Sequence, residues 1–243
     1  MLRDIYIISE GRTECFFIKN VLSEHLLTYG WIVVPITLPT SQKATGGYKG
    51  GWRRTGGYKY ALEEIRREII THMGKLHTTF FDLYGFPKDI PCYKQANSMS
   101  SPYDKAKLYE QQIKQDICKI FHDDDNYNAD LFIPYVQPYE FESFLFVDPK
   151  CSASVLFERD ELKAAALEKE MIKIASNFET PEHINGDSNT APSKRIEKLV
   201  PGFVKNKAGK AGFSWRAPQR IGVQGVRQTC QHFNEWLSIL ESY

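Results

Sequence analysis

The first 150 residues alternate between short apolar runs and longer stretches with helical spacing. Short apolar runs bounded by turn residues predict strands, and apolar positions three and four residues apart predict amphipathic helices. Strands are expected at 4–9, 31–38, 77–82 and 131–136, and helices at 13–28, 60–75 and 103–121. Thr13 is the expected N-cap of the first helix. The alternation predicts an α/β fold with a mostly parallel sheet of about four strands flanked by helices.

The pattern changes after residue 150. Helical spacing continues at 160–176, 192–199, 217–226 and 229–241, without a convincing strand between these stretches. No linker rich in proline, glycine and serine separates this part from the rest. We therefore predict an α/β core at 1–150 and a C-terminal helical extension at 151–243 that packs on the core.

Acidic residues follow the predicted strands. Glu10 and Asp82 each end a strand, Glu140 and Glu142 follow the fourth, and Glu14 lies in the first helical turn. Parallel strands end at one edge of a sheet, where α/β folds bind ligands. Carboxylate oxygens are the ligands that Mg²⁺ prefers, so a metal site at this edge is one interpretation. The other is structural, because acids commonly occupy turns and stabilise helix starts without a metal.

A glycine-rich repeat follows the second predicted strand, where residues 45–49 (TGGYK) recur as 55–59. The cations and aromatic residues around it are Lys43, Tyr48, Lys49, Trp52, Arg53, Arg54, Tyr58 and Lys59. Cations interleaved with rings suit a nucleic-acid backbone and its bases; the alternative is a surface loop whose rings pack locally. The chain lacks the Walker A sequence, so we do not expect it to hydrolyse nucleotides.

Composition narrows the class of protein. The net charge is +1, so a nucleic-acid surface would have to be a local patch. Five scattered cysteines argue against a disulfide framework and a structural zinc site, and Cys15 and Cys118 are expected to be core thiols. No signal peptide or membrane span is recognisable, which predicts a soluble cytoplasmic protein.

The acidic segments resemble the TOPRIM domain of topoisomerases, bacterial primases, recombination-mediator proteins and OLD-family nucleases. The resemblance begins with Glu10-Gly11-x-Thr13-Glu14 after a strand and Asp82 at the end of a later one. More narrowly, the chain resembles a bacterial TOPRIM-like family that is often encoded beside ABC- or AAA-type ATPases in phage-defence loci. The further matching segments are 82–87, 139–146, 184–195 and 231–237.

The resemblance implies that Glu10 is a metal ligand or general base, and that Glu14 and Asp82 are ligands to Mg²⁺ or Mn²⁺. TOPRIM domains usually carry Asp-x-Asp, but the second acid is missing after Asp82. Glu140 or Glu142 can supply it. In an extended segment both would lie on one face, and in a helix they would diverge by roughly 200°. Glu142 can instead be a buried structural residue.

Two cations follow a predicted helix start at Pro192-Ser193. Nucleases of this fold commonly place a basic residue near the metal, and Lys194 is the candidate for stabilising the transition state. The alternative is that Lys194 pairs with a structural carboxylate or is solvated. Arg195 is assigned to nucleic-acid binding together with Lys49, Trp52, Arg53, Arg54 and Lys59.

Three functions remain open. The first is a Mg²⁺-dependent nuclease acting on DNA or RNA, the effector of a two-component anti-phage, abortive-infection system with an ATPase partner. The second is a non-catalytic TOPRIM-like scaffold that docks on an ATPase and binds nucleic acid. The third is a phosphoryl-transfer enzyme acting on small nucleotides, for which no base pocket is evident in the sequence.

Overall fold

The computed structural model describes residues 2–38, 57–185, 189–200, 203 and 211–243. In these ranges the strands are β1 (Arg3–Ser9), β2 (Trp31–Thr37), β3 (Leu76–Asp82), β4 (Phe132–Ile133) and β5 (Val136–Gln137). They form one sheet in the order β2-β1-β3-β4, with β5 paired to β3, and every pairing is parallel. The predicted α/β fold with a parallel sheet is confirmed. The expected strand at 131–136 is instead two short strands around Pro134, which has no N–H to donate.

The helices are α1 (Arg12–Phe17), α2 (Ser23–Leu27), α3 (Gly57–Thr71), α4 (Tyr93–Ser98), α5 (Pro102–Ile120), α6 (Pro149–Leu156), α7 (Glu161–Ala175), α8 (Pro192–Leu199), α9 (Ala211–Thr229) and α10 (Gln231–Ser242). Short 3₁₀ helices are η3 (Leu83–Gly85), η4 (Ala129–Leu131), η5 (Phe141–Phe146) and η6 (Pro181–His183). A π-helical turn at Ile18–Leu22 joins α1 to α2.

Two local predictions were wrong. The N-cap of α1 is Gly11 rather than Thr13, because Gly11 is already extended (φ −139°, ψ 176°) and its carbonyl accepts the N–H of Cys15 at 3.2 Å. Cys15 and Cys118 are only half-buried, and the buried thiols are those of Cys92 and Cys230. All five cysteines are free.

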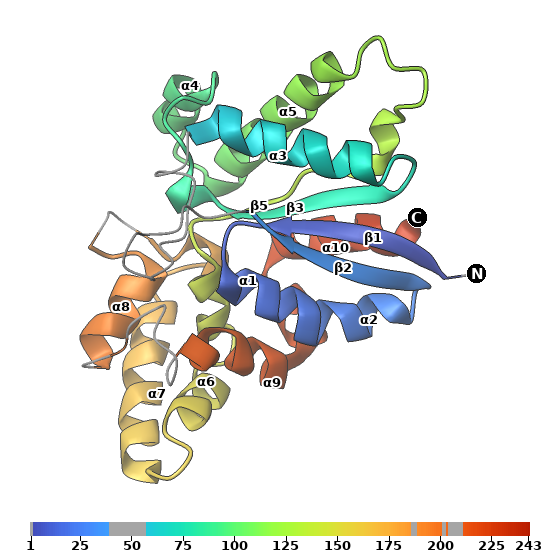
Figure 1. Cartoon of the computed structure of the whole chain (residues 1–243). Coiled ribbons are helices and arrows are strands. Elements are labelled where there is room, and N and C mark those ends of the chain that lie inside the picture. The colour runs from blue at the N-terminus through green and yellow to red at the C-terminus, as the bar shows by residue number, and fades with distance from the viewer. Residues whose placement is uncertain (1, 39–56, 186–188, 201–202, 204–210) are drawn as a thin grey trace, which may run out of the picture.

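Helices cover both faces of the sheet (Figure 1). On one face, Ile5 and Ile7 of β1 belong to a first core cluster with Phe17, Phe233 and Trp236, which come from α1 and α10. On the other face, a second core cluster contains residues of β1 and β3 together with α3 and α5; its members include Ile8, Phe81, Ile65 and Ile113. Burial on both faces explains why β1 is an almost continuous apolar run.

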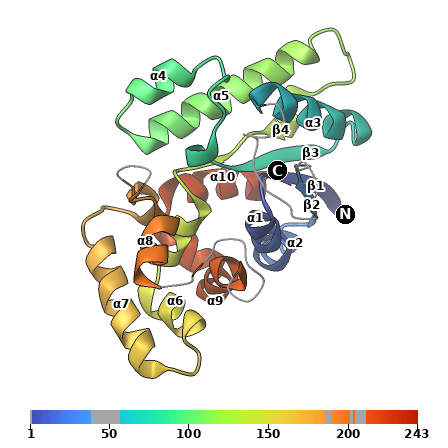
Figure 2. The same ribbon diagram turned by 60° about the vertical axis from the view of Figure 1, so that its left-hand side comes forward.

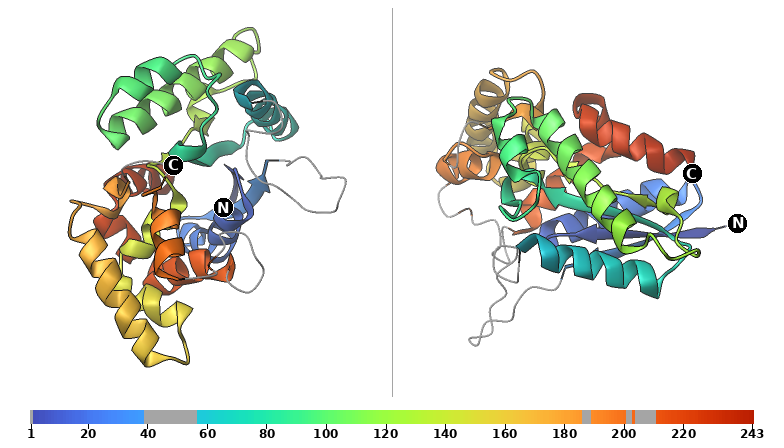
Figure 3. Two further views of the ribbon diagram at one scale, coloured as in Figure 1. Left: turned by 90° about the vertical axis from the view of Figure 1, so that its left-hand side faces the viewer. Right: turned by 90° about the horizontal axis from the view of Figure 1, so that it is seen from above.

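The residues after 150 pack in two places. Helix α10 belongs to the first core cluster, against the sheet. Helices α6, α7 and α8 surround η5 in a third core cluster that includes Leu145, Met171 and Ile196, and they form the lobe beside the sheet in Figures 2 and 3. Helix α9 is broken at Gly222, whose φ of 81° favours glycine. None of the described helices combines the length and hydrophobicity needed to cross a bilayer.

The strand order brings the ends of β1 and β3 together. From β1 the chain passes to β2 on one side of it, whereas β3 lies on its other side. The order therefore reverses between β1 and β3. In open α/β sheets the ligand crevice lies outside the carboxyl ends of the strands at this kind of reversal. Glu10 directly follows β1, and Asp82 is the last residue of β3.

Candidate functional site

Glu10 reaches from the end of β1 toward the segment after β3. Ser9 pairs with Phe80, so Glu10 follows the last paired position of β1 and lies beside the end of β3. Its carboxylate lies against Gly85 in η3, where an added Cβ would be 3.1 Å from one carboxylate oxygen and 3.2 Å from the other. Gly85 does not have a positive φ, so the backbone there permits any residue. A side chain at this position would press on the Glu10 carboxylate, which would have to shift by a few tenths of an ångström.

Glu14 lies in the first turn of α1, and its side chain folds back toward Gly11. Its Oε2 is 2.6 Å from the position that a Cβ on Gly11 would occupy. Gly11 has an extended backbone that any residue can adopt, so here too the missing side chain makes room for a carboxylate. Glu14 is buried. The two acids of the Glu10-Gly11-x-x-Glu14 segment are thus both accommodated by glycines.

Asp82 and Glu140 link the sheet edge to the elements that follow. Asp82 Oδ1 accepts the N–H of Phe141 at 2.9 Å, at the start of η5. Glu140 accepts two bonds from Ser193, at 2.9 Å from the backbone N–H and at 3.0 Å from the hydroxyl. Both acids are 7% exposed. They hold η5 on β3 and the start of α8 on η5, which fixes three segments around the carboxyl edge.

Glu142 and Glu140 differ in backbone conformation. Glu140 has an extended backbone (φ −142°, ψ 149°), whereas Glu142 lies inside the 3₁₀ turn of η5. The segment is therefore not a continuous extended stretch that would put both acids on one face. Glu142 is fully buried, which favours the structural interpretation of this residue over the metal-ligand one.

The predicted basic residues lie on α8. Lys194 Nζ is 2.7 Å from Glu197 Oε2, and the Lys194 side chain is 48% exposed. This ion pair matches the alternative in which Lys194 pairs with a structural carboxylate. Arg195 donates from Nε to the carbonyl of Thr190 at 2.7 Å, and its guanidinium faces the ring of Phe178. Both follow Ser193, whose contacts with Glu140 place the start of α8 beside the carboxylates.

Most of the predicted nucleic-acid loop lies outside the described residues, including Lys43, Tyr48, Lys49, Trp52, Arg53 and Arg54. Lys59 is described and is exposed in the first turn of α3. Tyr58 was wrongly predicted as a stacking ring. It is buried in the second core cluster, and its hydroxyl donates to Asp116 Oδ2 at 2.9 Å.

The chemical type of the side chains at this edge determines which class of metal ion they suit. Glu10, Glu14, Asp82 and Glu140 offer carboxylate oxygens, the ligand type of Mg²⁺, and Mg²⁺ commonly uses one or two carboxylates and several waters. Within the described part of the chain, no group of three or more His, Cys, Asp and Glu side chains is arranged to hold a metal. By donor chemistry alone, carboxylate oxygens suit a hard ion such as Mg²⁺ rather than a structural zinc ion, whose ligands are mostly cysteine and histidine.

A second polar cluster, which the sequence did not reveal, lies beside this edge between α5, η6 and α10. Glu182 accepts bonds from the Tyr103 hydroxyl at 3.0 Å and from the N–H groups of His232 and Phe233 at 3.0 and 3.1 Å. Burial raises the pKa of the Glu182 carboxyl. His232 Nε2 lies 2.7 Å from Glu110 Oε1. Burial lowers the pKa of His232, but the carboxylates of Glu110 and Glu182 outweigh it and leave the pKa raised.

His232 is thus a buried residue of the protein interior rather than part of the acidic edge. The other site residues that sequence reasoning missed are Gly85 and Ser193. Ser193 could have been found from the Pro-Ser helix start, since a serine there commonly binds a carboxylate or caps the helix. Nothing local marks Gly85, because its role depends on Glu10, which is distant in sequence.

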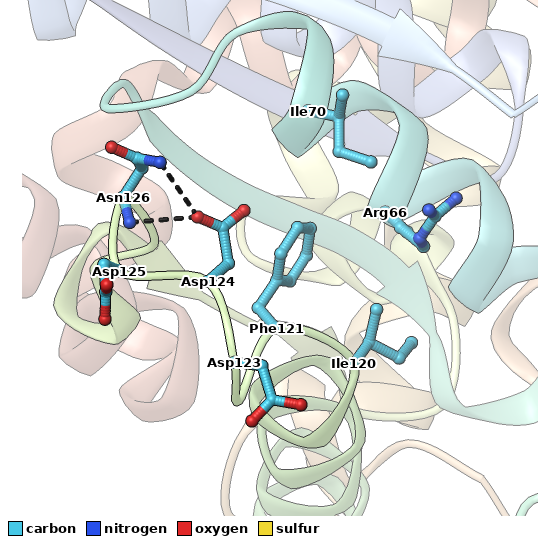
Figure 4. Close-up of a pocket in the computed structure, with 8 residues that line it drawn as sticks. All are labelled: Arg66, Ile70, Ile120, Phe121, Asp123, Asp124, Asp125 and Asn126. Carbon is cyan, nitrogen blue, oxygen red and sulfur yellow. Dashed lines mark hydrogen bonds between the residues drawn. The ribbon is translucent and has the colours of Figure 1, made fainter.

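A surface hollow of about 500 Å³ lies at the other end of the sheet. Figure 4 shows its lining by the last turns of α3 and α5 and by the loop at 121–126. Asp124 Oδ1 accepts bonds from the N–H and the side-chain amide of Asn126 at 2.9 and 3.1 Å. The hollow is remote from the carboxylates at the ends of β1 and β3.

Comparison with known proteins gives a family match. The model of the family described as a domain of unknown function, DUF4276, matches residues 9–241. The match runs from the last residue of β1 into α10, so it includes every acidic residue discussed above. Neither the curated proteins nor the solved structures contain a match to this chain.

Proposed function

This chain belongs to the DUF4276 family, and we propose that it is a Mg²⁺- or Mn²⁺-dependent nuclease that cleaves phosphodiester bonds in DNA or RNA. The observation that carries the proposal is the placement of Glu10 and Asp82 at the carboxyl ends of β1 and β3, where the strand order reverses. Glu14 and Glu140 extend the same acidic edge. The sequence resemblance to TOPRIM domains supports the same chemistry.

Glu10, Glu14 and Asp82 are the residues proposed to hold the ion. When bound, a divalent ion would neutralise phosphate charge and lower the pKa of a bound water. Hydrolysis adds water across a P–O bond, so the attacking water loses a proton and the leaving oxygen must gain one. Glu10, half-buried at the strand end, is the proposed acceptor of the water's proton.

Positive charge for the transition state is proposed to come from Lys194. Its ion pair with Glu197 is exposed, and exposed pairs of this kind contribute only about 0–1 kcal/mol, so the ammonium group can leave Glu197 for a phosphate. We propose that Lys59, Arg195 and the loop residues Lys49, Trp52, Arg53 and Arg54 contact the nucleic acid. An ATPase partner is proposed for a role in anti-phage defence, because the chain lacks a Walker A sequence.

A second candidate function is a non-catalytic scaffold that docks on an ATPase. The observation that favours it is the use of Asp82 and Glu140 as acceptors for backbone N–H groups at the starts of η5 and α8. Buried acids of this kind stabilise helix starts without any ligand. In this case the edge would be acidic for structural reasons.

Cleavage assays with three variants test the nuclease proposal. Glu10→Ala removes the proposed base and ligand, and Gly85→Ala keeps Glu10 but occupies the space of its carboxylate. We expect both to abolish or strongly reduce cleavage of plasmid DNA or tRNA in Mn²⁺ while the circular dichroism spectrum is unchanged. Glu63→Ala is the matched control, since Glu63 is 51% exposed and pairs with Arg66 on α3.

Full activity of Glu10→Ala would refute the nuclease proposal. A wild-type chain that cleaves neither substrate, and whose melting temperature does not rise with Mn²⁺, would support the scaffold. Metal that binds only the native state must raise its stability by RT ln(1 + [L]/Kd), so the melting measurement separates an inactive metal site from the absence of one.

A further inference from the structure

Tyr139 has a backbone conformation that bulky residues rarely adopt. Its φ is +58°, and among the described residues it is the one non-glycine residue with a positive φ. A large side chain in this region is sterically disfavoured, and such residues persist where the surrounding structure holds them. They are found most often in sites whose geometry depends on the strained turn.

The turn at Tyr139 connects the contacts that build the acidic edge. Two residues before it, Gln137 pairs with Asp82. The carbonyl of Tyr139 accepts the N–H of Tyr84, which lies just after β3, at 2.8 Å. The residue after it is Glu140, which accepts two bonds from Ser193. The chain bends between β5 and η5 at these residues, and a different φ at Tyr139 would turn Glu140 away from Ser193.

Phe141 completes the turn. Its N–H donates to Asp82 Oδ1 at 2.9 Å, so the same reversal sets the orientation of one of the proposed metal ligands. Both bonded amides, those of Phe141 and Ser193, therefore report whether the turn is held.

The packing of the Tyr139 ring holds the turn in place. The ring is half-buried and packs against the second core cluster. Glycine would tolerate the positive φ but would also populate negative φ values. It would not pin the turn.

We propose that Tyr139 is a positioning residue of the acidic edge, whose packed ring fixes the left-handed turn that places Glu140 and the N–H of Phe141. As a statement about metal binding this inference rests on the proposed function. As a statement about the geometry of the edge, it can be tested without a metal.

The test compares the full-length wild type with Tyr139→Gly, Tyr139→Phe and Tyr127→Gly. Tyr127→Gly is the matched control, because Tyr127 is also a partly buried ring packed on the second core cluster but belongs to the loop at the other end of the sheet. Tyr139→Asn is the second variant in case Tyr139→Gly does not fold, since asparagine tolerates a positive φ. Two quantities are measured: hydrogen exchange of the Phe141 and Ser193 amides without metal, and Mn²⁺ affinity by electron paramagnetic resonance.

We expect Tyr139→Gly to exchange both amides at least about tenfold faster than the wild type, while amides of β1 and β3 stay protected. Its Mn²⁺ affinity should fall by about tenfold or more, the size of effect seen when groups that orient metal ligands are removed. Tyr139→Phe keeps the ring and should restore both properties to nearly wild-type values. Tyr127→Gly should lower the melting temperature without changing the exchange of the two amides or the Mn²⁺ affinity.

The proposal would be overturned if the two amides exchanged as slowly in Tyr139→Gly as in the wild type. It would also be overturned if Tyr127→Gly lost as much amide protection and Mn²⁺ affinity as Tyr139→Gly. If the wild type binds no Mn²⁺, the nuclease proposal fails and the exchange rates alone decide the role of Tyr139. If the exchange rates rise but Mn²⁺ affinity is unchanged in Tyr139→Gly, the positioning of metal ligands by Tyr139 is refuted while the nuclease proposal stands.

Discussion

At the acidic edge, carboxylates are positioned both by hydrogen-bond donors and by neighbouring glycines that have no side chain. Gly85 and Gly11 carry no side chain where the carboxylates of Glu10 and Glu14 lie. The acids themselves could be predicted from the sequence, because each follows an apolar run or begins a helix. The glycine next to Glu10 could not, because that contact joins residues far apart in the chain.

His77 provides a prediction at the same scale, on the dependence of stability on pH. Its ring is buried, Nδ1 lies 2.9 Å from the carbonyl of Lys75, and Nε2 has no hydrogen-bond partner in the described structure. Burial lowers the pKa of His77 to about 4. The folded state therefore resists protonation, and stability present above the ordinary histidine pKa is lost as the pH falls from about 6.5 to 4.

We expect His77→Phe, which keeps a ring beside Tyr6, to reduce this acid sensitivity. The wild type should lose up to about 3 kcal/mol more than the variant between pH 6.5 and pH 4. Urea unfolding at several pH values measures the difference, and comparing the two proteins cancels the titration of the carboxylates that both share. Parallel curves would show that His77 is protonated as easily in the folded chain as in the unfolded one.

At the scale of elements, several helix starts are held by acids from distant segments. Asp82 binds the start of η5, Glu140 that of α8, Glu182 that of α10, and Asp89 that of α3 at 3.0 Å from the N–H of Tyr58. The sequence indicated most helices correctly because amphipathic spacing is local. It could not indicate these remote caps, and it missed the short helices α4 and α6.

Removing a remote cap should cost more stability than removing a local one. Glu182→Ala leaves the N–H groups of His232 and Phe233 and the Tyr103 hydroxyl buried without their acceptor, so we expect a loss of about 2–4 kcal/mol in the free energy of unfolding. Asp160 caps α7 locally, accepting the N–H of Lys163 at 3.0 Å in an exposed position. Asp160→Ala should cost much less, because water can replace it.

Denaturant titration of both variants measures this difference. Neither change touches Glu10 or Asp82, so Mn²⁺ affinity should stay unchanged in both proteins if they are folded. Equal small losses of stability in the two variants would show that Glu182 contributes little to fixing α10.

At the scale of the whole molecule, the order of the strands determines which strand ends are neighbours. Hydrophobic periodicity predicted the strands and their parallel arrangement, but not that β1 lies between β2 and β3. That order puts the ends of β1 and β3 side by side, so Glu10, directly after β1, and Asp82, the last residue of β3, lie at the same edge of the sheet. The covering helices, α3 and α5 on one face and α1 and α10 on the other (Figure 1), leave this edge as the place where the loops meet.

The most direct test of the acidic edge is a crystal of the full chain soaked in Mn²⁺ and measured at a wavelength where manganese scatters anomalously. A metal site at the ends of β1 and β3 predicts an anomalous peak in contact with carboxylate oxygens of Glu10 and Asp82, and its loss in Glu10→Ala. Manganese bound only elsewhere, or no peak at this edge at saturating Mn²⁺, would contradict it.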